Sequence, residues 1–236
     1  MIIIFKKKKI LLLIILGLII FIGYKKVNAK TEEVSALPIT NKTIILDAGH
    51  GLPDEGAVAK DGTSEEKINL EIVLKLQEIL ELSGVKVVLT RSDEQGIYNT
   101  DKESIKNKKI SDMKNRVEIG NNSNANIFVS IHLNKFSEEK YSGYQTFYNS
   151  KDEKSKMLAM IIQKNLKDCL KDENEREALS ISNKYIMDNV KIPTVIVECG
   201  FLSNREELEN LKKEEYQQKI AWGIYSGILE YFENLE

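Results

Sequence analysis

Short apolar runs alternate with longer amphipathic segments along most of this chain. The apolar runs are rich in β-branched residues, which is typical of buried strands. Of the amphipathic segments, residues 64–83 have the clearest helical spacing, because Ile72, Leu76, Ile79 and Leu80 form one apolar stripe. The pattern predicts strands at 43–47, 85–90, 126–132, 143–148, 184–188 and 194–198, and helices at 64–83, 111–122, 152–170 and over most of 204–232.

The order of these elements indicates the fold class. Strands that alternate with helices of this length form βαβ units, so we expect an α/β fold with a mainly parallel, twisted sheet of about six strands. Helices would cover both faces of this sheet. Active sites in such folds lie beyond the carboxyl ends of the strands, so candidate chemistry is sought there.

The first 29 residues have a different pattern from the rest. Four lysines at 6–9 precede an apolar run of 15 residues at 10–24, and small side chains at Val27 and Ala29 follow two further lysines. This pattern predicts a signal peptide or an N-terminal membrane anchor over residues 1–29. We therefore expect export across the cytoplasmic membrane and an outward-facing domain. Residues 30–40 are interpreted as a linker and 41–236 as one catalytic domain.

Charge and cysteine content narrow the classes of function. The first 29 residues hold six lysines and no acids, which leaves 28 basic against 36 acidic residues, a net charge of −8, for the remainder. Nucleic-acid binding needs a basic surface, so we expect no nucleic-acid partner. Two cysteines make no disulfide framework, and free thiols at Cys169 and Cys199 are favoured over a single disulfide.

Both histidines of the chain lie at the ends of apolar strands. His50 follows the first predicted strand, and His132 ends the third. Parallel strands bring both to one edge, where two imidazoles and a carboxylate would meet the needs of a catalytic zinc site. Glu65 or Glu66 would supply the carboxylate, although Thr63 and Glu66 also match a helix-capping box. For either histidine alone, a hydrogen-bonded structural ring is the competing interpretation.

Glu198 ends the apolar run TVIVE. Burial of a carboxylate is costly unless the group is paired or functional. Capping of the next helix is the alternative, but Ser203 and Glu206 already provide a capping box there. Burial beside a metal would raise the pKa of Glu198 toward the working pH, which suits a general base.

Six segments together resemble the zinc-dependent N-acetylmuramoyl-L-alanine amidases of the Amidase_3 family. The resemblance implies that His50 and His132 bind Zn²⁺ and that Glu198 is catalytic. The family's metal glutamate directly precedes a lysine, which selects Glu66 over Glu65. By nearness alone, Asp47 or a backbone carbonyl is expected to orient an imidazole. The segments are IILDAGHG (44–51), EEKINLEIVLKLQEIL (65–80), VKVVLTR (85–91), RVEIGNNSNANIFVSIHLN (116–134), SGYQTFY (142–148) and VIVECGFLSN (195–204).

The resemblance also implies a substrate and a setting. Such enzymes cut the amide between the lactyl group of N-acetylmuramic acid and L-alanine in peptidoglycan. A single catalytic domain behind an export segment is most like the CwlD-type amidases, which modify the spore cortex for muramic δ-lactam formation and germination. We expect an accessory or activating protein, because no wall-binding module is evident. The alternatives are a zinc exopeptidase acting on cell-wall peptides and a catalytically silent wall-binding protein; the substrate-binding residues are not predicted.

Overall fold

The computed structural model describes residues 15–18, 21 and 37–235. Residues Leu37–Glu236 form one compact unit, which starts just before the predicted catalytic domain because Ile39 is fully buried in its core. Most of the predicted export segment and most of the linker lie outside the described residues. Among the residues that are described, no helix combines the length and apolar character needed to cross a membrane.

A six-stranded sheet organises the unit, in the strand order β2-β1-β3-β6-β4-β5. Strand β1 is parallel to β2 and β3, β3 is parallel to β6, and β4 is parallel to β5; only the β4–β6 pair is antiparallel. The predicted fold class, a mainly parallel sheet in an α/β fold, is therefore confirmed. The strands are β1 (Thr43–Ala48), β2 (Lys86–Leu89), β3 (Ile127–Asn134), β4 (Gln145–Tyr148), β5 (Leu179–Ser180) and β6 (Thr194–Phe201).

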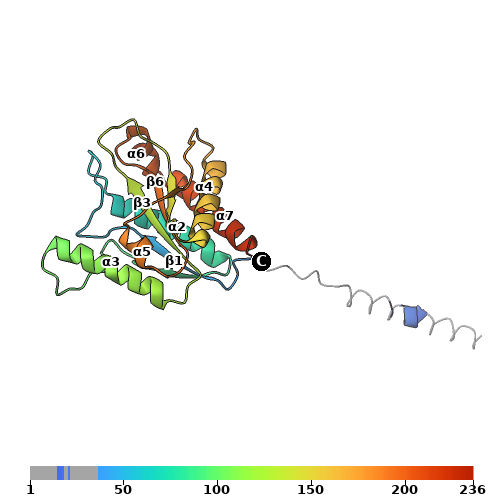
Figure 1. Ribbon diagram of the computed structural model, residues 1–236. Coiled ribbons are helices and arrows are strands. Elements are labelled where there is room, and N and C mark those ends of the chain that lie inside the picture. The colour runs from blue at the N-terminus through green and yellow to red at the C-terminus, as the bar shows by residue number, and fades with distance from the viewer. Residues whose placement is uncertain (1–14, 19–20, 22–36, 236) are drawn as a thin grey trace, which may run out of the picture. The chain divides into compact units, whose positions relative to one another are not determined.

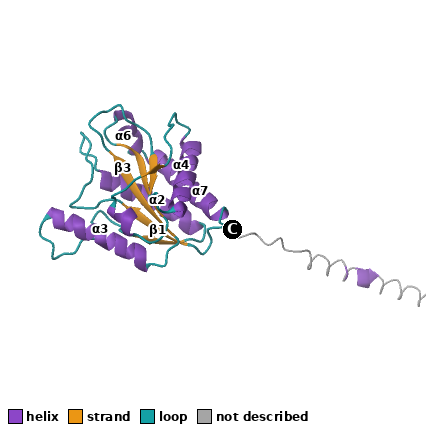
Figure 2. Ribbon diagram, in the orientation of Figure 1, coloured by secondary structure: helices purple, strands orange, loops and turns teal. Residues whose placement is uncertain are grey.

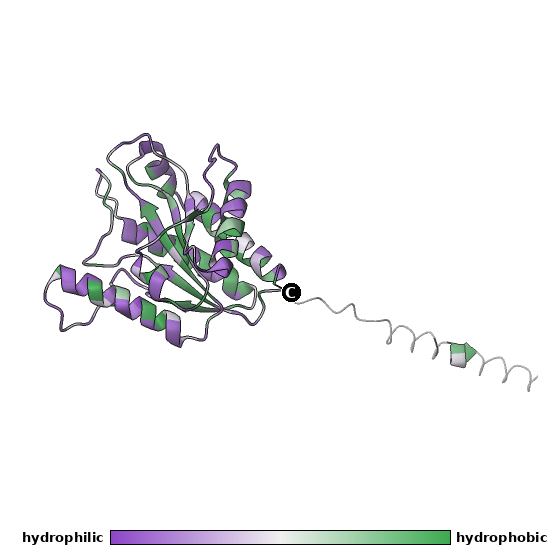
Figure 3. Cartoon of the chain, in the orientation of Figure 1, coloured by the Kyte–Doolittle hydropathy of each residue, from purple (hydrophilic) through white to green (hydrophobic). Residues whose placement is uncertain are grey.

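Helices cover both faces of the sheet, as Figures 1 and 2 show. One layer packs on the sheet through α2 and α4, and α7 packs against both of these helices, while α3 and α5 pack against each other on the opposite side. A buried apolar cluster lies on each side of the strands, and Figure 3 shows the hydrophobic strands at the centre of the domain. The helices are α2 (Glu65–Leu82), α3 (Ile105–Asn122), α4 (Glu153–Leu170), α5 (Tyr185–Asn189), α6 (Arg205–Leu211) and α7 (Glu214–Glu233).

The strand predicted at 184–188 is wrong, because this segment forms helix α5. The Val190 amide donates a hydrogen bond to the Ile186 carbonyl at 2.9 Å, which closes a helical turn, and both side chains enter the apolar cluster around Phe128. The sixth strand is instead the short edge strand β5. Helix α3 also begins earlier than predicted, at Ile105, where the Ser104 hydroxyl accepts a hydrogen bond from the Asn107 amide.

The register of the sheet places the candidate residues side by side. His132 on β3 is the cross-strand neighbour of Glu198 on β6, and Asp47 on β1 pairs with Ser130. The carboxyl ends of β1, β3 and β6 thus meet at one edge, as predicted. Cys169 and Cys199 are both free thiols, which confirms the favoured interpretation.

Candidate metal centre and active site

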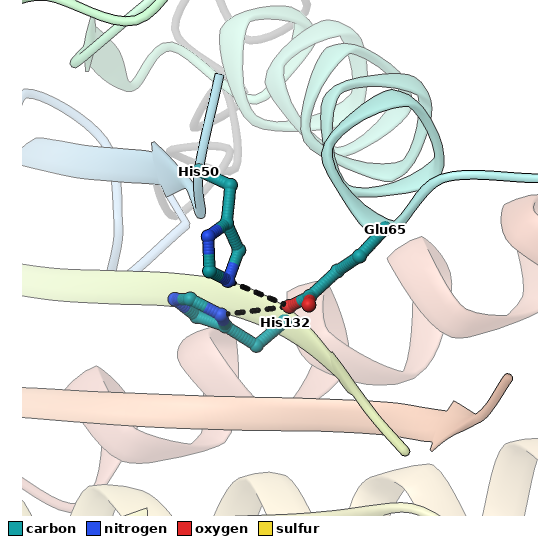
Figure 4. Close-up of side chains that lie close together, drawn as sticks. All are labelled: His50, Glu65 and His132. Carbon is teal, nitrogen blue, oxygen red and sulfur yellow. Dashed lines mark hydrogen bonds and ion pairs between the residues drawn. The ribbon is translucent and has the colours of Figure 1, made fainter. Parts of the chain in front are cut away.

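Two histidines and one glutamate converge at this edge of the sheet (Figure 4). Oε1 of Glu65 lies 3.3 Å from Nε2 of His50 and 3.0 Å from Nδ1 of His132. In the described part of the chain, this is the one group of three or more such side chains whose ligand atoms all lie within 4.8 Å of one another. Two imidazoles and a carboxylate are a donor set that zinc accepts, with a fourth position left for water or substrate.

The backbone around His50 is shaped to let these side chains meet. His50 itself has a φ of 62°, a left-handed conformation that costs a non-glycine residue free energy and often occurs at functional sites. A Cβ on Gly49 would lie 2.3 Å from the His132 ring, and one on Gly56 would lie 2.6 Å from Oε2 of Glu65. Glycine at these two positions therefore leaves room for the group.

The glutamate in this group is Glu65, which corrects the prediction of Glu66. Neighbouring helical residues point about 100° apart, so only one of the two side chains can face the histidines. Glu65 does so, and it also accepts hydrogen bonds from the amides of Leu133 (3.1 Å) and Ala57 (2.8 Å). Glu66 instead accepts a hydrogen bond from the Ser64 hydroxyl at 2.9 Å.

Helical spacing alone does not separate Glu65 from Glu66, because Asn69 lies four residues after the first and three residues after the second, and both spacings make neighbours on a helix. In the structure Asn69 pairs with Glu65. The Asn69 amide donates to Oε1 of Glu65 at 3.4 Å and to the carbonyl of Gly49 at 3.2 Å. A lysine directly after the glutamate does not separate the two residues either, because it says nothing about the face of the helix.

Asp47 does not orient an imidazole, in contrast to the prediction. It is fully buried and accepts hydrogen bonds from Ser130 (2.5 Å) and Thr90 (2.7 Å) while pairing with the buried Arg116. Asp54 has the orienting position, because its Oδ2 lies 3.0 Å from Nδ1 of His50. This contact forms within the loop after β1, where no periodic pattern in the sequence could have indicated it.

The carboxylates and His50 shift one another's titration. Burial alone would raise the pKa of Glu65, but its hydrogen bonds with His132 and His50 outweigh burial and hold that pKa far below its usual range. Burial alone would lower the pKa of His50, whereas the bonds to Asp54 and Glu65 raise it to about 9. Without a metal, the group is therefore held together by a protonated His50 and an ionised Glu65.

Glu198 faces the same site without belonging to the ligand group. It lines a cavity of about 320 Å³ together with His50 and His132. Its Oε2 is buried and has no hydrogen-bond partner among the described residues. Burial raises the pKa of this carboxyl group, and the nearby His132 and Lys184 partly oppose that effect. A carboxylate with an unpaired oxygen and a raised pKa is suited to accepting a proton from a bound molecule.

Comparison with known proteins agrees with this geometry. Residues 44–230 match the family model Amidase_3, N-acetylmuramoyl-L-alanine amidase. The germination-specific N-acetylmuramoyl-L-alanine amidase of Bacillus subtilis (strain 168) is 36% identical over 221 residues, which cover 92% of each chain. The CwlD amidase of Clostridioides difficile, solved in complex with the GerS lipoprotein, is 49% identical with a TM-score of 0.80 and covers 82% of this chain and 100% of its own. The chain therefore belongs to the N-acetylmuramoyl-L-alanine amidase family Amidase_3.

Proposed function

We propose that this protein is a zinc-dependent amidase that hydrolyses the lactyl–L-alanine amide of peptidoglycan, with His50, Glu65 and His132 as metal ligands and Glu198 as the general base. The observation that carries the proposal is the convergence of two imidazoles and a carboxylate on one point, beside a carboxylate that is not part of the group. A bound Zn²⁺ would polarise the scissile carbonyl and lower the pKa of a water molecule toward about 7.

The protein's own residues have separate tasks in this scheme. Glu198 takes a proton from the attacking water and returns it to the alanine nitrogen as the amide breaks, so it must change protonation state near neutral pH. Its burial and its unpaired Oε2 support this role. Asp54 accepts a hydrogen bond from Nδ1–H of His50 and thus leaves Nε2 free to face the ligand group.

The names of the relatives and the N-terminal sequence support a biological setting. We propose a role in spore-cortex modification or germination, because the Bacillus subtilis relative is named as germination-specific and the similarity extends over 92% of both chains. We also propose that an accessory protein assists this enzyme. The solved CwlD amidase of Clostridioides difficile is in complex with the GerS lipoprotein, which supports such a partner. The basic and apolar pattern of residues 1–29 supports export, with the domain outside the cytoplasmic membrane.

Mass spectrometry of digested peptidoglycan tests the proposed bond. The full-length protein is loaded with zinc and incubated with purified peptidoglycan, and a parallel sample contains excess chelator. We expect stem peptides with a free N-terminal alanine beside intact glycan strands, and none of either product in the chelated sample. Cleavage between two amino acids of the stem peptide would instead establish an exopeptidase or endopeptidase. Wall binding without any cleavage in the zinc-loaded sample would refute enzymatic function.

A further inference from the structure

Helix α3 is connected to the metal ligand His50 in two ways, one direct and one through Asp54, although the helix lies far from that residue in sequence. The Arg116 guanidinium donates a hydrogen bond to the His50 carbonyl oxygen. Lys109 lies seven residues earlier on the same face of α3, and its Nζ is 2.7 Å from Oδ1 of Asp54. The other oxygen of Asp54 is 3.0 Å from Nδ1 of His50. Helix α3 thus contacts the backbone of His50 directly and its ring through Asp54.

The bonds to Asp54 constrain the direction of its carboxylate. Oδ1 accepts from Lys109 and from the Gly56 amide at 3.1 Å, which leaves Oδ2 to face the imidazole. A histidine ligand needs such a partner on its second nitrogen, because that bond sets both the tautomer and the ring orientation. Without Lys109, the carboxylate would keep only one bond on Oδ1 and would lose the nearby positive charge.

We propose that Lys109 is a positioning residue of the metal site. By holding Asp54 against Nδ1 of His50, it raises the affinity of the site for zinc and makes that affinity depend on the placement of helix α3. This inference rests on the proposed ligand set, but it concerns a residue that does not contact the metal. Two other interpretations exist for Lys109: an exposed ion pair without measurable effect, and a substrate contact, since its side chain also lines the catalytic cavity.

Zinc affinity, measured by competition with a chromophoric chelator, tests the proposal without reference to activity. We expect Asp54→Asn to raise the dissociation constant for zinc about 10- to 100-fold, the usual effect of losing a ligand's hydrogen-bond partner. Lys109→Met should raise it by roughly 2- to 5-fold, as expected for a partly exposed ion pair. The effect of Lys109→Met should be smaller at high salt. Lys106→Met, on the exposed side of the same helix, is the matched control and should bind zinc like the wild type.

A double-substitution cycle separates the proposal from its alternatives. Because Lys109 acts through Asp54, adding Lys109→Met to Asp54→Asn should weaken zinc binding no further. Wild-type zinc affinity in Lys109→Met would overturn the proposal, and a raised KM with unchanged affinity would identify a substrate contact instead. Additive losses in the double variant would also overturn it. Thermal unfolding in chelator confirms that the variants are folded. If zinc failed to bind the wild type at all, the ligand set itself would be wrong, which is a distinct result.

Discussion

Single substitutions of the two adjacent glutamates at the start of α2 should have very different effects on zinc affinity: a large loss for Glu65 and almost no change for Glu66. In Glu65→Gln, an amide replaces the carboxylate whose Oε1 lies between the two imidazoles. A neutral amide is a weaker zinc ligand and, if it is flipped, presents NH₂ hydrogens to the histidines. In Glu66→Gln, the side chain can still accept the hydrogen bond from Ser64. The two variants have the same composition and differ by one position, so each is the control for the other.

The expected size of the effect follows from the number of ligands. Zinc sites of four protein ligands bind with about 10–16 kcal/mol, or roughly 3 kcal/mol for each ligand. Loss of Glu65 should therefore raise the dissociation constant for zinc by about two orders of magnitude. Part of this loss is offset in the metal-free protein, because the substitution also removes the ionised partner that stabilises protonated His50. Glu66→Gln should change zinc affinity by less than about 2-fold, because Glu66 contacts none of the ligands in the structure.

Zinc content after dialysis and the dissociation constant by chelator competition are the measurements. Both variants should keep the far-ultraviolet circular dichroism of the wild type, since neither removes apolar contacts. The reasoning is refuted if Glu66→Gln loses zinc while Glu65→Gln retains it. Equal losses in both variants would show that substitution at the start of α2 acts on the fold and not on a ligand.

Three further predictions concern catalysis, pH and stability. Glu198→Gln should lower kcat by about 10²- to 10⁴-fold and leave zinc affinity within a few-fold of wild type; a variant that hydrolyses the amide at the wild-type rate would disprove the general-base role. Because the pKa of His50 is raised to about 9 in the metal-free protein, zinc must displace its proton below that pH. Affinity should therefore fall as pH falls from 9, and calorimetry in buffers of different ionisation enthalpy should detect about one proton released at neutral pH; the absence of proton release would contradict the protonated state of His50. Finally, Arg116→Met leaves the fully buried Asp47 without its counter-charge and should lower the free energy of unfolding by about 3–5 kcal/mol in urea denaturation, whereas Lys106→Met should change it by less than about 0.5 kcal/mol.

The sequence by itself determined the fold class and the edge where the site lies. Buried parallel strands leave a strong local signal, because most residues in them are apolar and many are β-branched. The runs that end just before His50, at His132 and at Glu198 therefore located three of the four proposed chemical positions. Parallel pairing of β1, β3 and β6 then brings these positions together, since the carboxyl ends of parallel strands share one edge.

Only the tertiary structure decided the details that depend on direction. Glu65 and Glu66 are adjacent residues of the same type. The rotation of α2 about its axis relative to the sheet determines which of them contacts the histidines. Asp54, and not Asp47, lies beside His50. Asp47 is instead paired with Arg116, which lies far away in the chain. Helix α5 forms where a strand was predicted because five residues are too few for a periodic signal, and packing against Phe128 settles their conformation. In each case the deciding contact joins residues that are distant in sequence, so no local pattern could have encoded it.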